Sequence, residues 1–395
     1  MIELLQISFW IALFLVFYTY IGYAILVWFL VKIKSIIKPW QEPEILADED
    51  LPTCTLAVPG YNEVDFIKAK AENALALKYP KDKLKIVFVT DGSNDGTPDV
   101  LRGIQGIEVW HRDERKGKIA AMNRAMEMID SEITVFCDAN TMLNETCLLE
   151  IAKHYQDPKV GGVSGEKVVL SENEDNASGA GEGIYWKYES FLKRKDAELH
   201  TLVGSAGELF SVRTNLFEPV ESDSILDDFM ISMRLVEQGY KVAYEPKARA
   251  SETASVNVSE EFKRKVRIAA GGFQSIARLR SLLNIFKYSW SSFEYISHRV
   301  MRWAIAPFML PLILLLNITI VIFDQSLLFQ VLLALQLVFY GAAILGWLLE
   351  QRRIKLKILF VPFYFSMMNY AVLAGFKRHL KGSQSALWEK SKRKM

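Results

Sequence analysis

The chain reads Ile133-Thr134-Val135-Phe136-Cys137-Asp138-Ala139-Asn140 near its middle, an apolar run that ends in two polar side chains. Runs rich in β-branched and aromatic residues favour β-strands. Three similar runs precede it: Thr55-Leu56-Ala57-Val58, Lys85-Ile86-Val87-Phe88-Val89 and Glu108-Val109-Trp110. Each is followed by a polar turn and a helix-like segment. The region from Pro52 to Glu252 therefore predicts an α/β fold, a mostly parallel sheet with helices on both faces.

Polar residues follow the first two of these strands. Ligands of parallel sheets bind beyond the carboxyl ends of the strands, so these positions are candidates for a site. After the first strand, Tyr61 offers a stacking face for a nucleobase and Glu63 an acceptor for base or ribose donors, although a Pro-Gly turn entering a helix explains the same residues. After the second, Asp91 can accept hydrogen bonds from a base, and ordinary Asp-Gly turn chemistry is the alternative.

The next two strand ends carry a basic turn and a polar tripeptide. Arg115-Lys116-Gly117-Lys118 opens a helix expected to run to about Ile129. Cations at a helix start oppose the helix dipole unless an anion such as a diphosphate is bound, and a solvated basic turn is the alternative. Asp138 and Asn140 point the same way if the chain is extended. Two oxygen donors on one side suit Mg²⁺ or Mn²⁺, whereas a plain turn needs no metal.

The order of these motifs resembles family 2 glycosyltransferases, which have the GT-A, Rossmann-like fold. Along residues 50–280 come Pro-x-Tyr-Asn-Glu, Asp-Gly-Ser-x-Asp-Gly-Thr, Lys-Gly-Lys and Asp-x-Asn. The resemblance implies that the nucleotide-sugar, commonly a uridine derivative, is bound by Pro59, Tyr61, Glu63, Asp91, Lys118 and Asp138. It also implies that Asp138 and Asn140 hold a divalent cation. Asn140 stands where the family usually has a second carboxylate, so we expect weaker metal affinity.

A pair of acids later in the chain resembles the segment that carries the family's catalytic base. Asp227-Asp228 precedes a helix that leads to a Gly-Tyr turn, and the resemblance makes Asp228 the base and Asp227 an acceptor-side residue. Paired acids also simply favour a helix N-terminus. The preceding Gly204-Ser205-Ala206-Gly207 resembles the family's small-residue segment beside the sugar and acceptor, and a tight turn is the alternative. Gly179-Ala180-Gly181-Glu182-Gly183 is expected to be a loop that enters a helix at Ile184.

A basic segment after the sheet resembles the Gln-x-x-Arg-Trp motif of cellulose, chitin and hyaluronan synthases. Arg267 matches the arginine, which implies a contact with the diphosphate. Arg264 replaces the glutamine and Ile268 the tryptophan that receives a growing polymer, which puts processive synthesis in doubt. A basic amphipathic helix on the anionic inner leaflet explains the same residues, and both roles can coexist.

Apolar stretches flank the charged middle region. The chain is 51% hydrophobic, and residues 8–31 hold no charge over a length that can cross a membrane as a helix. Further candidates lie at about residues 303–323, 327–349 and 357–376. Lys32, Lys34 and Lys38 place the following domain in the cytoplasm of a multi-pass plasma-membrane protein. Three later spans then put the tail outside, although basic residues from Lys377 to Lys394 favour the inside.

This layout gives six expected regions. A membrane helix (1–33) and a linker (34–50) precede the cytoplasmic GT-A domain (51–258), which is followed by interfacial helices (259–302), membrane helices (303–376) and a basic tail (377–395). His298 and Trp303 lie among aromatic and basic residues typical of a membrane interface, where anchoring is favoured over a role toward the acceptor.

Cysteine and histidine usage excludes other classes of site. The three cysteines have no Cys-x-x-Cys spacing and are expected to be buried free thiols, and the five histidines lack the spacing of zinc ligands. We also expect no nucleic-acid partner.

The sequence therefore predicts a membrane-bound inverting glycosyltransferase that moves a sugar from a UDP-sugar to a hydroxyl of a lipid or saccharide acceptor. Cell-envelope or extracellular polysaccharide synthesis is the expected pathway. A processive synthase that also translocates its polymer is the nearest alternative. A transporter or membrane scaffold with a nucleotide-sensing domain is the alternative of another class, which the low charge of the spans disfavours.

Overall fold

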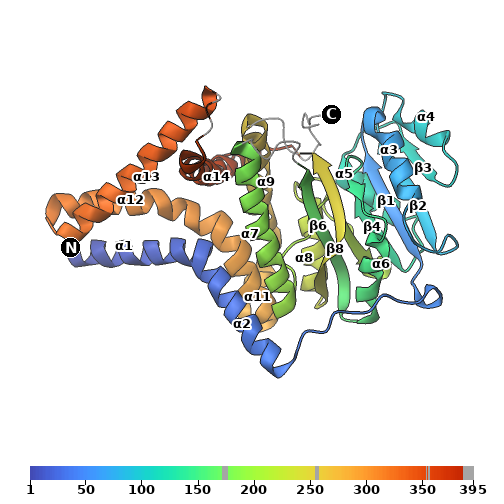
Figure 1. Cartoon of the computed structure of the whole chain (residues 1–395), viewed down its shortest axis with the longest axis horizontal. Helices are drawn as coiled ribbons and strands as arrows, with labels where there is room; N and C mark the ends of the chain where they lie inside the picture. Colours follow the sequence, from blue (N-terminus) through green and yellow to red (C-terminus); the bar gives the residue numbers. More distant parts are fainter. Residues whose placement is uncertain (171–176, 254–257, 353, 355, 386–395) are drawn as a thin grey trace.

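The structure is a computed structural model that describes the chain apart from residues 171–176, 254–257, 353, 355 and 386–395. Figure 1 shows two parts, an α/β domain built on one sheet and a group of long helices that project away from it. Helix α7 (Ala177–Leu199) lies between them and contacts α2 (Tyr23–Ile37), so the two parts are joined by helix packing as well as by the chain.

The sheet has eight strands within the described residues, in the order β3-β2-β1-β4-β7-β6-β8-β5. The four expected strands are β1 (Cys54–Gly60), β2 (Leu84–Asp91), β3 (Glu108–Arg112) and β4 (Ile133–Cys137). The others are β5 (Met142–Leu143), β6 (Val160–Leu170), β7 (Leu209–Arg213) and β8 (Lys241–Thr253). Strand β7 runs antiparallel to both β4 and β6. The expected mostly parallel sheet is confirmed.

The two faces of the sheet bury separate hydrophobic cores. Successive side chains of a strand point to opposite faces. In β1, Leu56 and Val58 join one core and Ala57 the other; in β4, Val135 and Phe136 are divided in the same way. Helices cover both faces, which explains why these central strands are apolar throughout instead of alternating.

The helices of the α/β domain follow the strands as the pattern predicted. They are α3 (Val64–Leu75), α4 (Thr97–Arg102), α5 (Lys118–Met126), α6 (Cys147–Ala152), α7 and α8 (Asp227–Glu237). All three cysteines are free and buried, as expected.

The described part of the chain has four helices long and apolar enough to cross a membrane: Ile2–Ile37, Trp290–Phe323, Leu327–Gln351 and Ile358–Leu380. The first combines α1 (Ile2–Phe17), a π-helical turn and α2. The second combines α11 (Trp290–Tyr295), a π-helical segment (Ile296–Ile305) and α12 (Ala306–Phe323); the others are α13 (Leu327–Gln351) and α14 (Lys357–Leu380). Helix α9 (Val258–Arg278) and the short α10 (Ile285–Tyr288) lie between the domain and α11.

The first of these helices bends where it meets the α/β domain (Figure 1). The π-helical turn at Tyr18–Gly22 lies at the bend, a common cause of a change in helix direction. Beyond it, the Tyr23 hydroxyl donates to Asp196 Oδ1 on α7 at 2.7 Å. The Lys34 ammonium donates to the carbonyl oxygen of Leu199 at 2.7 Å, at the end of α7. This helix therefore anchors the domain as well as entering the apolar region.

One helix is longer than its uncharged stretch, and one sequence expectation about a helix bound is wrong. The first helix extends past both ends of residues 8–31 and ends at Ile37, because α2 continues along α7. The glycine-rich stretch 179–183 is helical, since α7 begins at Ala177. Glycine lowers helix propensity by about 1 kcal/mol relative to alanine, a cost that packing elsewhere in a helix of 23 residues outweighs.

Helix α14 lies against α9 and approaches it closely. A Cβ at Gly375 would come within 2.5 Å of the Ala269 Cβ, so only glycine allows this approach. The helix is continuous through Pro362. This packing places the carboxyl-terminal apolar helix beside the basic segment of α9.

Candidate active site

A small cleft lies at the carboxyl ends of β1 and β2. It is lined by residues that the sequence singled out together with their neighbours: Pro59, Gly60, Tyr61, Asp91, Arg115, Gly117, Lys118 and Ala121. Because β1 and β2 are parallel neighbours, their following loops meet at one edge of the sheet. Four expected nucleotide-binding residues are thereby brought together.

Asp91 fixes the basic loop that leads to α5. Its Oδ2 accepts hydrogen bonds from the backbone N–H of Lys116 at 2.8 Å and of Gly117 at 2.6 Å. Gly92 has φ +70° and leaves no room for a Cβ beside the Arg115 backbone. This carboxylate therefore presents Lys118 at the start of the helix.

At the cleft, the Tyr61 ring is stacked against the guanidinium of Arg115. The Arg115 guanidinium lies 3.8 Å from the centroid of the Tyr61 ring. Guanidinium planes stack on aromatic rings and on bases alike, so these two side chains form a stacking surface at the cleft.

An ammonium surrounded by carboxylates lies where β4, α5 and α8 meet. The Lys118 Nζ is 2.7 Å from Asp138 Oδ1 and 3.4 Å from Asp227 Oδ2. All three side chains are only 14–15% exposed. Burial alone would lower the pKa of Lys118, but the surrounding carboxylates, led by Asp138 and Asp227, outweigh it and hold that pKa above its usual value. Lys118 is therefore a permanent cation at this position.

Asp228 is the adjacent acid and has a different environment. Burial is the main cause that raises its pKa to about 7, and the neighbouring charge of Asp227 acts in the same direction. The Phe229 N–H donates to Asp228 Oδ1 at 2.8 Å and orients the carboxylate at the start of α8. A carboxylate with a pKa near neutrality is suited to take up a proton during a reaction.

The space beside Asp228 is so narrow that two glycines of the small-residue segment have little or no room for a side chain. A Cβ at Gly207 would lie 3.2 Å from Asp228 Oδ2 and 3.3 Å from the Lys118 Nζ. Gly204 has φ +83°, and a Cβ there would be 2.1 Å from the Phe229 ring. The small-residue segment is thus packed directly onto the start of α8.

The donors at the end of β4 suit a divalent cation. Asp138 supplies a buried carboxylate, and Asn140 supplies a neutral carboxamide oxygen two residues later. Oxygen donors of this kind, completed by phosphate oxygens and water, match the preference of Mg²⁺ and Mn²⁺. The residues present therefore fit such an ion with one protein carboxylate fewer than an Asp-x-Asp motif offers.

Three expected nucleotide-binding residues line neither cavity: Glu63, Asp138 and Arg267. Glu63 is buried at the N-cap position of α3. Arg267 lies on α9, partly buried, and its Nε has no hydrogen-bond partner among the described residues. The neighbouring Arg264 contacts Glu261, 2.7 Å from Nη2 to Oε2.

A larger cavity on the other side of Asp228 escaped the sequence analysis. It has a volume of about 500 Å³, and Ser205, Ala206 and Asp228 line one part of it. Trp303 and Ile268 also line it, whereas His298 is buried and its Nδ1 lies 2.5 Å from Asp196 Oδ2, which accepts the hydrogen bond. Most of the remaining wall comes from α7, α9, α14 and the π-helical segment Ile296–Ile305. One signal was present in the sequence, the pair Arg299 and Arg302 at helical spacing.

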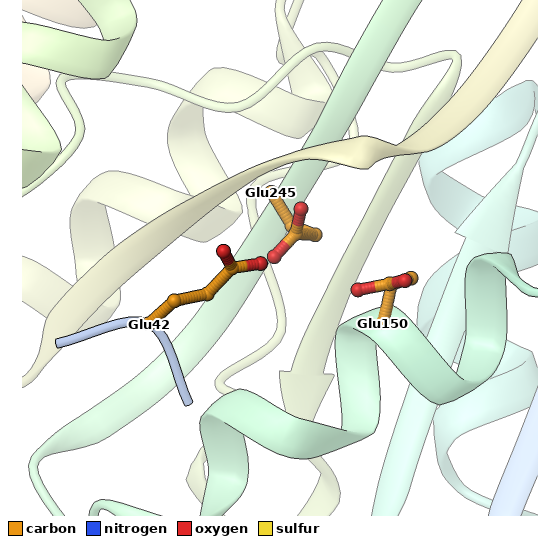
Figure 2. A group of neighbouring side chains, drawn as sticks. All are labelled: Glu42, Glu150 and Glu245. Carbon is orange, nitrogen blue, oxygen red and sulfur yellow. The ribbon is translucent and has the colours of Figure 1, made fainter. Parts of the chain in front are cut away.

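Three carboxylates elsewhere resemble a metal site. Oxygens of Glu42, Glu150 and Glu245 lie within 4.8 Å of one another, and Figure 2 shows them converging from the linker, α6 and β8. The Lys153 Nζ is 2.9, 2.6 and 2.8 Å from them, respectively. The ammonium supplies the cation, so this cluster holds the linker to the domain.

We expect Lys153→Met to destabilise the domain by about 3–5 kcal/mol, because it leaves the buried Glu150 and Glu245 without their cation. Thermal unfolding in detergent would show the loss as a lower Tm. Lys247→Met is the matched control, since Lys247 also contacts Glu42 but is exposed, and should change Tm little. Equal Tm values for both variants would contradict the role of Lys153.

The sheet order and the strand-end cleft define a GT-A fold attached to membrane helices. A mannosyltransferase from Pyrobaculum calidifontis, solved with GDP-Man and Mn²⁺, shares this fold with a TM-score of 0.67 at 23% identity, over 94% of this chain and 99% of that one. Residues 55–219 match the family model described as glycosyl transferase family 2. By this match, residues 55–219 form a domain of the glycosyltransferase family 2 type.

Two relatives from staphylococci have the same name. The poly-beta-1,6-N-acetyl-D-glucosamine synthase of Staphylococcus aureus (strain MSSA476) is 29% identical over 253 residues, which cover 60% of this chain and 58% of that protein. The protein of that name from Staphylococcus epidermidis is 23% identical over 226 residues, 55% of this chain and 54% of that protein. The chain thus spans a little over half the length of these relatives.

Proposed function

We propose that this chain is a membrane-bound inverting glycosyltransferase that moves a sugar from a nucleotide-sugar, expected to be a UDP-sugar, to an acceptor hydroxyl. Cell-envelope or extracellular polysaccharide synthesis is the proposed pathway, supported by the names of the staphylococcal relatives. The observation that carries the proposal is the convergence of Lys118, Asp138 and Asp228 between two cavities, one at the strand ends and one toward the membrane helices.

In the proposed reaction the acceptor hydroxyl enters beside Asp228. Asp228 takes the hydroxyl proton while the acceptor oxygen forms a bond to the anomeric carbon of the donor sugar. The bond from that carbon to the diphosphate breaks, and the nucleoside diphosphate leaves with the electron pair. Lys118 lies at the adjacent position and stabilises the negative charge that develops on the leaving group.

A divalent cation held by Asp138 and Asn140 would neutralise diphosphate charge when bound. Asp91 would keep the basic loop against the nucleotide, and the Tyr61 and Arg115 pair would face the base. Arg267 stays a proposed diphosphate contact, one that requires α9 to move relative to the cleft.

The test is nucleotide release by the full chain in membranes. A panel of UDP- and GDP-sugars would be incubated with and without Mn²⁺ or Mg²⁺, and free nucleoside diphosphate measured. Metal-dependent release from one donor supports transfer. Binding without release under all conditions would favour the non-catalytic scaffold instead.

Asn140→Asp tests the metal site. The added carboxylate should lower the Mn²⁺ concentration that gives half-maximal turnover by on the order of tenfold, because ligand charge sets affinity for hard cations. Asn140→Ala should raise that concentration. An unchanged metal requirement in both variants would show that residue 140 is not a ligand.

The pH profile tests the environment of Asp228. Its carboxylate must be deprotonated to act as a base, so kcat/KM should fall as the pH drops below about 7. Asp227→Asn removes a charge that raises the pKa of Asp228, and the acidic limb should shift to lower pH. A limb that stays in place would rule out Asp228 as the titrating group.

A processive synthase is the second candidate. The relatives are synthases of a polymer, and Trp186 and Trp303 line the larger cavity beside α14. The tryptophan of the synthase motif is replaced by Ile268, which also lines that cavity. Product length decides: a single added sugar excludes processive synthesis, and a ladder of products establishes it.

A further inference from the structure

The cavity of about 500 Å³ connects the proposed base to the membrane helices. Its lining changes in character from Asp228 toward α14, where Phe360, Val361, Phe365 and Met368 form an apolar wall. Val361 also belongs to a helix that can cross a membrane and is 57% exposed. The edge of the cavity therefore opens onto the apolar surface of α14.

Contacts between aromatic rings and cations give the order of groups between these two ends. Phe229, next to Asp228, packs edge-on against Trp303 with ring centroids 5.3 Å apart. The Arg299 guanidinium lies 5.8 Å from the Trp303 ring.

From there the wall continues to α14. The Arg302 guanidinium lies 5.7 Å from the Tyr188 ring, whose hydroxyl donates to the Tyr20 carbonyl at 2.8 Å. The Tyr20 hydroxyl donates to Asn369 Oδ1 on α14 at 2.5 Å. Cationic groups thus lie between the base and the apolar wall.

The cavity carries an excess of positive charge. Its lining includes five cations, Lys193, Arg264, Lys265, Arg299 and Arg302, against three carboxylates, Glu189, Glu208 and Asp228. Glu261, behind the wall, pairs with Arg264 and Lys265, so the excess lies with the other three cations.

Glu189 is shared by two of these cations. Its oxygens lie 2.7 Å from Arg299 and 2.8 Å from Arg302, so one carboxylate faces two guanidinium groups. Lys193 is 4% exposed; the charges of Glu166 and Glu208 act on it from a distance, but within the described residues no carboxylate forms a direct ion pair with it. Buried cations in excess favour an anionic ligand.

We propose that this cavity holds an acceptor saccharide carried on a lipid phosphate or diphosphate, with its sugar hydroxyl at Asp228, its phosphate among Lys193, Arg299 and Arg302, and its hydrocarbon chain along α14. The proposal rests on the proposed function and specifies its acceptor. A free neutral oligosaccharide uses the aromatic rings but leaves the buried charge of Lys193 and the apolar wall without matching groups. Only an amphiphile with a charged junction matches all three zones.

Binding tests the proposal without relying on turnover. Farnesyl phosphate, farnesol and inorganic phosphate would each be titrated against the full chain in neutral detergent by thermophoresis. Farnesyl phosphate should bind at least about tenfold more tightly than either fragment, because it alone satisfies the cations and the apolar wall together. The proposal is overturned if farnesol or inorganic phosphate binds as tightly as farnesyl phosphate.

Lys193→Met supplies the matched variant. It keeps the length of the side chain and removes the charge, so affinity for farnesyl phosphate should fall about tenfold while farnesol binding stays unchanged. The unchanged farnesol binding shows that the variant is folded. Lys187→Met, an exposed position on the same helix, should leave both affinities unchanged. An unaltered farnesyl phosphate affinity in Lys193→Met contradicts the assignment of the phosphate to these cations.

Turnover separates this proposal from the function on which it rests. With the active donor, a farnesyl-diphosphate-linked N-acetylglucosamine should be a better acceptor than octyl N-acetylglucosaminide or free chitobiose. Equal use of the three acceptors overturns the lipid phosphate proposal and leaves the glycosyltransferase intact. If none of the nucleotide-sugars in the panel releases its nucleotide, the proposed function is wrong. The binding results still decide the ligand of the cavity.

Discussion

Asp228→Asn is expected to lower the kcat of sugar transfer by about 10²–10⁴-fold, because general bases contribute rate factors of this size. The amide has nearly the same shape and keeps an oxygen that accepts the Phe229 N–H, the bond that Asp228 Oδ1 makes at 2.8 Å. The start of α8 should therefore remain in place. Turnover of the purified variant and its affinity for the nucleotide-sugar are the two measurements.

Nucleotide affinity distinguishes loss of chemistry from loss of structure. Asp228 does not line the cleft at the strand ends, so the variant should bind the donor as the wild type does. Asp227→Asn is the matched control at the adjacent position, where turnover should persist with a shifted pH profile. Wild-type turnover in Asp228→Asn would show that Asp228 is not the base. Another residue would then have to take the proton of the acceptor hydroxyl.

The part of the fold nearest the amino end of the domain could be predicted because local patterns agree with the global structure there. In β1, β2 and β4 an apolar run, a turn and a helix follow one another, and each strand is buried on both faces. Strand β6 could not be predicted from its local sequence pattern. It contains Gly161, Gly162 and Gly165, which as a local pattern indicate turns.

These glycines are explained only by tertiary packing. A Cβ at Gly162 would be 2.9 Å from a Leu235 methyl group on α8, and one at Gly165 would be 2.6 Å from Leu209 on β7. Such close approaches depend on elements that are distant in sequence. The same limit applies to the large cavity, whose wall joins segments between Tyr20 and Val372 that share no local pattern.

The ion pair between Lys118 and Asp227 shows which features of the site a family pattern predicts and which it does not. The motif order placed both residues at a nucleotide-sugar site, yet nothing in either local sequence indicates an ion pair between positions 109 residues apart. The structure adds that Lys118 lies between the proposed metal ligand and the acid pair, 2.7 Å from Asp138 Oδ1 and 3.4 Å from Asp227 Oδ2. An ammonium therefore occupies the space between these carboxylates.

Lys118→Met is expected to reduce kcat by about 10²–10³-fold, the size found when one donor to a developing negative charge is removed. It also leaves Asp138 and Asp227 facing each other without their cation. Repulsion should then raise the pKa of Asp228 further, because Lys118 acts to lower it, and the acidic limb of the pH profile should move to higher pH.

The same variant should become dependent on metal for stability. Like charges at close range are relieved by a bound cation, so Mn²⁺ should raise the Tm of Lys118→Met more than that of the wild type. Lys116→Met is the control from the same loop, since its ammonium is half exposed and contacts only Glu114 among the described carboxylates. If Lys118→Met kept wild-type turnover and showed the same Mn²⁺ response in Tm, Lys118 would have no part in balancing these carboxylates, and the leaving group would have to be stabilised from elsewhere.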